Sequence, residues 1–171
     1  GKVQKLESKM VKEKPKGKIG IAHTRWATHG KPSEKNAHPH VSNNRVFIVH
    51  NGIIENYVTL KEQLIKKGYQ FNSQTDSELI AHQLDFFLSQ GSEMLEAMSL
   101  LKEKLEGAYA VAAIDLKNES HFYLMRNKSP LLLGQSNAGM FAASDPLALA
   151  DLTNEFVFLE DGDVAEVSAK E

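Results

Sequence analysis

Apolar residues along the chain recur with two periods, one typical of helices and one typical of strands. Short apolar runs predict strands over residues 19–23, 46–50, 108–115, 121–126, 131–134, 140–143, 156–159 and 164–167. Helical spacing predicts three helices between them, marked by the stripes Tyr57, Leu60, Leu64; Ile80, Leu84, Phe87, Leu88; and Met94, Met98, Leu101, Leu105. Strands and helices do not alternate regularly, which favours antiparallel pairing. We therefore expect an α+β fold in which sheet packs on sheet and helices lie outside.

Composition adds few constraints on function. A length of 171 residues with 42% hydrophobic content indicates one globular domain, and the net charge is only −2. Residues 1–18 hold seven Lys against two Glu, but they lack aromatic residues and arginine, so a solvated amphipathic segment is expected rather than a nucleic-acid-binding arm. No apolar run is long enough to span a membrane, and a cytoplasmic location is expected. The chain contains no cysteine, which excludes thiol chemistry by its own residues.

Two polar groups follow predicted strands and are candidates for a small-molecule site. Arg25 follows the strand over 19–23, where a planar guanidinium suits a two-pronged bond to a carboxylate, although a surface ion pair would also explain it. Asn51-Gly52 follows the strand over 46–50. An Asn-Gly turn there competes with an oxyanion hole formed by the Asn amide and the Gly backbone N–H.

A third polar group precedes the second predicted helix. Thr75 and Glu78 have the spacing of a capping box, in which each side chain bonds the other's backbone N–H. Asp76 would then lie in the first helical turn, where the helix dipole favours a carboxylate. The same carboxylate is equally suited to bind an ammonium group, and both interpretations stay open.

Five of the seven histidines lie within a short stretch, which raises metal binding as an alternative. His38-Pro-His40 resembles the His-x-His pairs of hydrolytic metal sites. However, Glu34 is the only acidic residue between His23 and His50, so a mixed shell of imidazole and carboxylate needs distant residues. Hydrogen bonding by these imidazoles is the expectation that we prefer, and no metal or cofactor is predicted.

Several motifs together resemble one known family. They are His23-Thr-Arg-Trp-Ala-Thr-His-Gly30, Asn36-Ala-His-Pro-His40, Val49-His-Asn-Gly-Ile-Ile-Glu-Asn56, Thr75-Asp76, Leu105-Glu-Gly-Ala-Tyr-Ala110, Lys128-Ser-Pro-Leu131, Ala143-Ser-Asp145 and Phe158-Leu-Glu-Asp-Gly-Asp163. The set is similar to the glutaminase domain of the glutamine:fructose-6-phosphate aminotransferases, and it covers almost the whole chain. The resemblance implies an N-terminal-nucleophile hydrolase fold, a four-layer sandwich with helices outside two packed antiparallel sheets.

The resemblance also implies a reaction and its partners. In this family an amino-terminal Cys attacks the side-chain amide of glutamine, and ammonia passes to a sugar isomerase domain that aminates fructose 6-phosphate. Glutamine or glutamate would be the ligand, the isomerase domain of the same parent chain would be a partner, and the intact enzyme would be a homo-oligomer. Neither nucleic acid nor a membrane is expected as a partner.

The resemblance assigns roles to particular residues. Arg25 would bind the substrate carboxylate with help from Thr28 and the backbone at His29, and Asp76 would bind the ammonium. Asn51 and the Gly52 N–H would form the oxyanion hole, while the Gly52 carbonyl would accept from the substrate amine. Trp26 would guard the ammonia route, and His38 would organise the pocket by hydrogen bonding.

One feature departs from the family pattern. Position 1 is Gly, and the Cys-Gly-Ile start of the family, which supplies both the nucleophile and the α-amino general base, does not occur in the sequence. We therefore expect residues 1–171 to be one glutaminase-type domain fragment, truncated at the N-terminus and without the isomerase domain, that shows no glutaminase turnover alone. A metal-dependent hydrolase and a non-catalytic amino-acid-binding domain are the alternatives.

Overall fold

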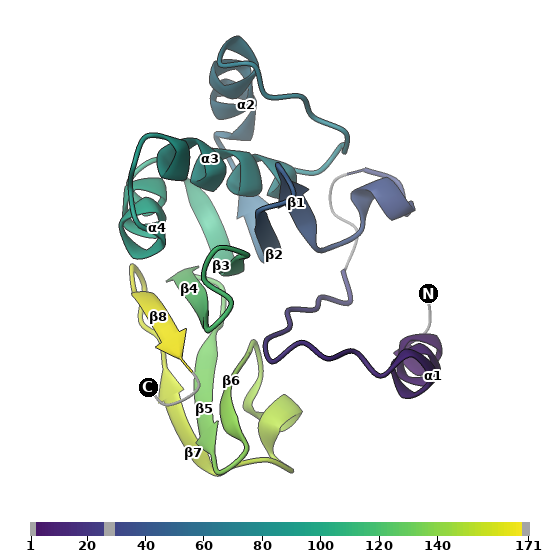
Figure 1. Ribbon diagram of the computed structural model, residues 1–171. Helices are drawn as coiled ribbons and strands as arrows, with labels where there is room; N and C mark the ends of the chain where they lie inside the picture. Colours follow the sequence, from purple (N-terminus) through teal and green to yellow (C-terminus); the bar gives the residue numbers. More distant parts are fainter. Residues whose placement is uncertain (1–2, 26–29, 169–171) are drawn as a thin grey trace.

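The computed structural model describes residues 3–25 and 30–168, which form two antiparallel sheets and four α-helices (Figure 1). The larger sheet has the order β1-β2-β3-β4-β8, and the smaller one has the order β6-β5-β7. The strands are β1 (His40–Ser42), β2 (Val46–Ile54), β3 (Gly107–Asp115), β4 (His121–Asn127), β5 (Leu132–Ser136), β6 (Gly139–Ala143), β7 (Glu155–Phe158) and β8 (Val164–Ser168). The helices are α1 (Val3–Glu13), α2 (Tyr57–Lys66), α3 (Ser77–Ser89) and α4 (Met94–Lys102), with 3-10 helices η1 (Glu34–Asn36) and η2 (Pro146–Leu149).

Each face of the larger sheet is covered by a different layer. Strand β3 shows the division, because Val111 and Ala113 join the core formed with α3 and α4, whereas Ala110 and Ala112 join a second core shared with the smaller sheet. Successive side chains of a strand point to opposite faces, so this alternation places helices on one face and the smaller sheet on the other. Two packed antiparallel sheets with helices outside were expected, and this arrangement is confirmed.

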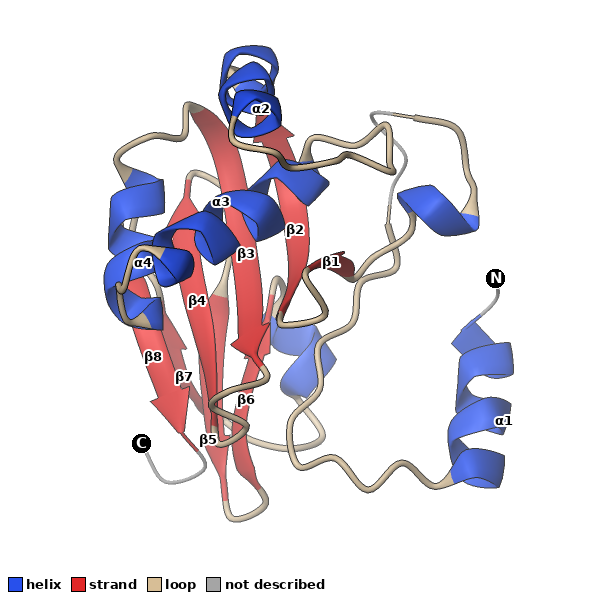
Figure 2. Ribbon diagram, turned by 45° about the horizontal axis from the view of Figure 1, so that its top comes forward, coloured by secondary structure: helices blue, strands red, loops and turns tan. Residues whose placement is uncertain are grey.

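Helix α3 is the element that brings distant parts of the chain together. It contacts β1 and β2 and lies across the larger sheet (Figure 2), while its far side meets α2 and α4. It is therefore buried along most of its length, including the polar residues Glu78, His82 and Asp85. Its first turn lies next to the second half of β2, because Ile54 N–H donates to the Asp76 carboxylate at 2.8 Å.

Two expected strands differ from those in the structure. Residues 19–23 form an irregular segment, since no described strand pairs with them and a strand requires a neighbour to complete its backbone hydrogen bonds. Strand β2 does not end at His50 but continues through Asn51-Gly52 to Ile54, in an unbroken register with β3. The short strand β1 was not expected at all. Helix α4 also ends at Lys102, before Leu105, which is buried outside the helix.

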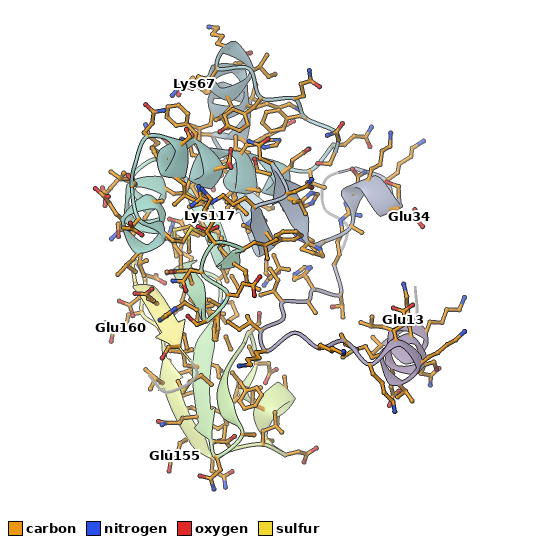
Figure 3. The ribbon with its side chains drawn as sticks, in the orientation of Figure 1. Glu13, Glu34, Lys67, Lys117, Glu155 and Glu160 are labelled. Carbon is orange, nitrogen blue, oxygen red and sulfur yellow. The ribbon has the colours of Figure 1, made fainter. Side chains whose placement is uncertain are left out.

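Helix α1 projects from the rest of the chain (Figure 1) and has no buried residue. Its side chains, including Glu13, surround the helix on all sides in Figure 3. The expected solvated amphipathic segment is thus confirmed. In the described part of the chain, no helix has the length and apolar character that crossing a membrane requires.

Candidate functional site

A cavity of about 290 Å³ lies where the segment after residue 22, the second half of β2 and the start of α3 meet. The three groups singled out in the sequence share this cavity, although they are up to 51 residues apart in the chain, from position 25 to position 76. Its wall is formed by His23, Arg25, His38, His50, Asn51, Gly52, Ile53, Thr75, Asp76 and Ser77. A larger hollow of about 700 Å³ on the far side of α3 contains none of the three groups.

Arg25 enters the cavity from an irregular segment rather than from a strand end. Its backbone has a φ of +49°, and its N–H donates to His23 Nδ1 at 3.0 Å. One guanidinium nitrogen, Nη2, donates to the carbonyl of Gly30 at 3.1 Å. The guanidinium is the only permanent positive charge in the described wall of the cavity. Three other predicted binding residues, Trp26, Thr28 and His29, lie outside the described residues.

Asn51 and Gly52 line the cavity from within β2, so their sequence does not mark a hairpin turn. The backbone directions of β2 explain how they can face a ligand. Alternate residues of an antiparallel strand direct their backbone N–H groups to the same edge. The N–H of Ile54 points to Asp76 rather than to β3, which places the N–H of Gly52 on that same edge. Among the described strands, only β1 pairs along this edge of β2, and the pairing extends along β2 only as far as Ile48.

Asp76 is 3% exposed and lies at the cap position of α3, but its carboxylate does not cap the helix. Oδ2 accepts from Ile54 N–H, and the other oxygen accepts no hydrogen bond from the described part of the chain. The predicted capping box is wrong as well. The Thr75 hydroxyl bonds His40 Nε2 at 2.9 Å, and the Glu78 carboxylate bonds residues 72 and 73 instead of the start of the helix.

The histidines around the cavity are neutral at physiological pH. Burial, together with the neighbouring imidazoles and Arg25, lowers the pKa of His38 to about 3. Burial also lowers the pKa of His50 to about 4, and it lowers the pKa of both His23 and His40. Neutral imidazoles can accept as well as donate hydrogen bonds. The described residues of the wall therefore include one carboxylate and one guanidinium among groups without net charge.

The histidines interact through ring contacts and hydroxyl bonds. The ring centroid of His38 lies 4.5 Å from that of His23 and 4.9 Å from that of His40. Its Nδ1 is buried without a hydrogen bond in the described part of the chain. His50 Nδ1 bonds Ser77 Oγ at 2.9 Å. Within the described residues, no three His, Asp or Glu side chains are grouped as metal ligands would be.

Sequence reasoning missed His50 and Ser77 as wall residues, and it missed the role of Glu78. The available signal was the unbroken polar run Thr75-Asp-Ser-Glu78 at the start of an apolar helix, and all four of these polar residues are buried. A helix start that faced solvent would not need four consecutive buried polar residues. The partners of Thr75, Asp76 and Ser77, however, lie 22 to 35 residues away in the chain and are visible only in the structure.

Comparisons with known proteins agree with this geometry. A family model described as a glutamine amidotransferase domain matches residues 23–151. The glutamine–fructose-6-phosphate aminotransferase (isomerizing) of Vibrio parahaemolyticus is 48% identical over 171 residues, and that of Photorhabdus laumondii is 49% identical over 170 residues. These alignments cover 100% and 99% of the chain, but the chain spans only 28% of each relative.

Solved structures show the same fold. The glutamine phosphoribosylpyrophosphate amidotransferase from B. subtilis, complexed with ADP and GMP, aligns with a TM-score of 0.71 at 24% identity. An allosteric regulatory enzyme of purine biosynthesis aligns with a TM-score of 0.73 at 25% identity. Each alignment covers 86% of the chain and 32% of the solved protein.

Proposed function

Because the chain belongs to the glutamine amidotransferase domain family, we propose that the cavity around Arg25, Asn51-Gly52 and Asp76 binds glutamine. A free amino acid presents one carboxylate and one ammonium on the same carbon. The observation that supports the proposal is the presence of one guanidinium and one carboxylate in a single small cavity, with an amide and a strand edge between them. A volume of about 290 Å³ suits a ligand of this size.

Each end of the ligand has a partner in this proposal. Arg25 binds the α-carboxylate, and the oxygen of Asp76 that Ile54 does not use binds the α-ammonium. The side-chain amide then extends along the edge of β2. There the Asn51 side chain and the Gly52 N–H stabilise the negative charge that develops on the amide oxygen when a nucleophile attacks its carbon.

The attacking group is not among these residues. The chain has no cysteine, so a thiol nucleophile would have to come from polypeptide outside the 171 residues. The residues of this chain would bind and orient the substrate and stabilise the oxyanion, while ammonia leaves as the carbon–nitrogen bond breaks. The described imidazoles are held neutral, and we assign them to positioning rather than to proton transfer.

For the whole protein we propose the reaction that gives the relatives their name, the transfer of glutamine nitrogen to fructose 6-phosphate. The chain spans 28% of such a relative, which leaves ample length for a sugar isomerase domain. We propose that domain as the partner that receives the ammonia, and a homo-oligomer as the assembled form. Residues 1–171 would constitute the glutamine-binding part.

Calorimetric titration with three ligands tests the glutamine site. L-Glutamine carries both charged groups, 4-carbamoylbutanoate lacks the ammonium, and 4-aminobutanamide lacks the carboxylate. Asp76→Asn should weaken L-glutamine binding about tenfold or more, because a hydrogen bond to a charged group contributes about 1.5–3 kcal/mol, and should leave 4-carbamoylbutanoate binding unchanged.

The matched variant addresses the other end of the ligand. Arg25→Lys keeps the charge but removes the fork, so it should weaken L-glutamine binding and leave 4-aminobutanamide binding unchanged. If either variant weakens all three ligands equally, its residue supports the fold and does not contact the ligand. If L-glutamine does not bind the unmodified chain at all, the proposed function is wrong for this chain.

A further inference from the structure

A buried carboxylate lies behind the cavity wall without lining it. Glu78 is 5% exposed and belongs to the first turn of α3. Its carboxylate accepts the backbone N–H of Asn72 at 2.9 Å, the backbone N–H of Ser73 at 2.7 Å and the Ser73 hydroxyl at 2.7 Å. It therefore binds the loop that leads into α3 rather than any part of the cavity itself.

The same loop continues into the cavity wall. Ser73 Oγ, held by Glu78, lies 3.0 Å from Thr75 Oγ1, which bonds His40 Nε2 at 2.9 Å. Residue 76 follows directly and carries the carboxylate that accepts from Ile54 N–H. A continuous series of short polar contacts thus connects Glu78 to Thr75 of the wall, and Asp76 is the next residue along the chain.

The Glu78 carboxylate is held ionised. Burial alone would raise its pKa, but the nearby His82 ring and the hydrogen bonds from Asn72 and Ser73 outweigh this effect and lower the pKa to about 2. His82 Nε2 lies 3.6 Å from Glu78 Oε1, and its other ring nitrogen bonds Ser42 Oγ at 2.8 Å. A charged acceptor in a buried position makes strong hydrogen bonds to backbone N–H groups, so these bonds restrain the loop.

A cap for α3 would not require this arrangement. A side chain that caps a helix bonds the N–H groups of its first turn, whereas Glu78 bonds two N–H groups of the loop before the helix. Its effect is to fix residues 72–76 relative to α3. The Asp76 carboxylate gains its position from this loop and from one hydrogen bond with β2.

We propose that Glu78 is a positioning residue of the glutamine site, which fixes the Asp76 carboxylate and thereby sets the affinity and selectivity for a ligand with an α-ammonium group. The proposal rests on the proposed function for its ligand. Glu78 contacts no ligand, and its effect reaches the cavity through Ser73 and Thr75. Two contacts in series, from Glu78 to Ser73 and from Ser73 to Thr75, lead to the residue that precedes Asp76, and a third fixes Thr75 to His40.

The test compares two buried carboxylates of α3 that form hydrogen bonds with different parts of the chain. Glu78→Gln removes the charge at the loop. Asp85→Asn is the matched control, because Asp85 is also 5% exposed but accepts from Asn43 Nδ2 and Tyr69 OH, at the opposite end of the helix from the cavity. Ser73→Ala is a milder variant that breaks the series of contacts at its second member and keeps Glu78.

Calorimetry should show about tenfold weaker L-glutamine binding for Glu78→Gln, a smaller loss for Ser73→Ala, and no change for either variant with 4-carbamoylbutanoate, which has no ammonium. Asp85→Asn should bind both ligands as the unmodified chain does. Equal losses for both ligands, or no loss for Glu78→Gln, would overturn the proposal.

A measurement without ligand separates this proposal from the proposed function. The Ile54 N–H donates to Asp76, so its hydrogen exchange reports how well that carboxylate is held. The rate of hydrogen exchange at the Ile54 amide is compared with the rates of β3 amides that exchange only on global unfolding. Relative to these, the Ile54 amide should exchange faster in Glu78→Gln and in Ser73→Ala, and at an unchanged rate in Asp85→Asn. If the Ile54 amide exchanges at the same rate in all four proteins, Glu78 does not position Asp76, whether or not glutamine binds.

Discussion

Replacing Gly52 by alanine should damage the site and the sheet together. Gly52 pairs with Tyr109 across β2 and β3, and the two backbones approach closely there. A Cβ atom built on Gly52 would lie 2.0 Å from the carbonyl oxygen of Ala108 and 2.8 Å from the Tyr109 Cα. Carbon and oxygen atoms normally stay about 3.3 Å or more apart even in close strand contacts. The neighbouring atoms are backbone, so they cannot rotate away as a flexible side chain could.

The expected loss of stability has two components. The backbone of Gly52 has a φ of +141°, a conformation that costs a residue with a side chain about 1–3 kcal/mol. Relief of the contact requires β2 and β3 to separate locally. That separation gives up ladder hydrogen bonds of about 1 kcal/mol each and opens the packing around Tyr109, which is 1% exposed. Together these effects should lower the free energy of unfolding by about 3–5 kcal/mol.

Gly139→Ala is a matched control for the conformational component. Gly139 has a φ of +133°, close to that of Gly52, but a Cβ there would meet no atom within 4 Å. Urea unfolding followed by far-ultraviolet circular dichroism should show a loss of about 1–3 kcal/mol for Gly139→Ala and at least about 2 kcal/mol more for Gly52→Ala. Equal losses in the two variants would refute the argument that close approach of the strands requires glycine at position 52.

Two further predictions concern stability. The free energy of unfolding should fall from pH 6.5 toward pH 4, by up to about 1.4 kcal/mol per pH unit from His50 alone. The reason is that the imidazole of the unfolded chain binds a proton in this range, while the buried imidazole, with a pKa of about 4, does not. Denaturant titrations that give equal stability at pH 7 and pH 5 would contradict this prediction. Asp115→Asn should destabilise the fold by about 2–4 kcal/mol in the same assay, because it breaks a two-pronged bond to Arg45 with distances of 2.9 and 2.7 Å. Glu13→Gln, in an ion pair with Lys9 whose side chains are more than 60% exposed, should have no measurable effect.

The sequence predicted those parts of the fold that depend on local pattern. Helices α2, α3 and α4 follow from their apolar stripes, and most strands were placed within a residue or two. Burial of one face of a helix or strand places apolar residues at regular intervals, which can be read from the sequence. The segment before Arg25 has the same apolar character as a strand. It is not one, since strand formation depends on a neighbour that residue pattern cannot specify.

The residues of the site could be predicted from the sequence, but the hydrogen bonds that connect them could not. Arg25, Asn51-Gly52 and Asp76 were identified by their chemistry and their resemblance to a family, and the structure brings them to one cavity. The continuation of β2 past Gly52 was missed because Asn-Gly usually marks a turn, whereas here the glycine permits close approach to β3. The role of Glu78 was missed because its spacing from Thr75 matched a capping box, whereas its carboxylate binds the backbone of residues 72 and 73.

A structure of the chain determined with bound L-glutamate is the most direct test of the central claim, that one amino acid is held between Arg25, Asp76 and the edge of β2. The account predicts that the α-carboxylate lies within hydrogen-bonding distance, about 2.7–3.2 Å, of the Arg25 guanidinium, with the ammonium at Asp76 and the side-chain carboxylate at Asn51 and Gly52. Ligand bound in the hollow beside His82, or in the cavity with its charged groups away from Arg25 and Asp76, would contradict it.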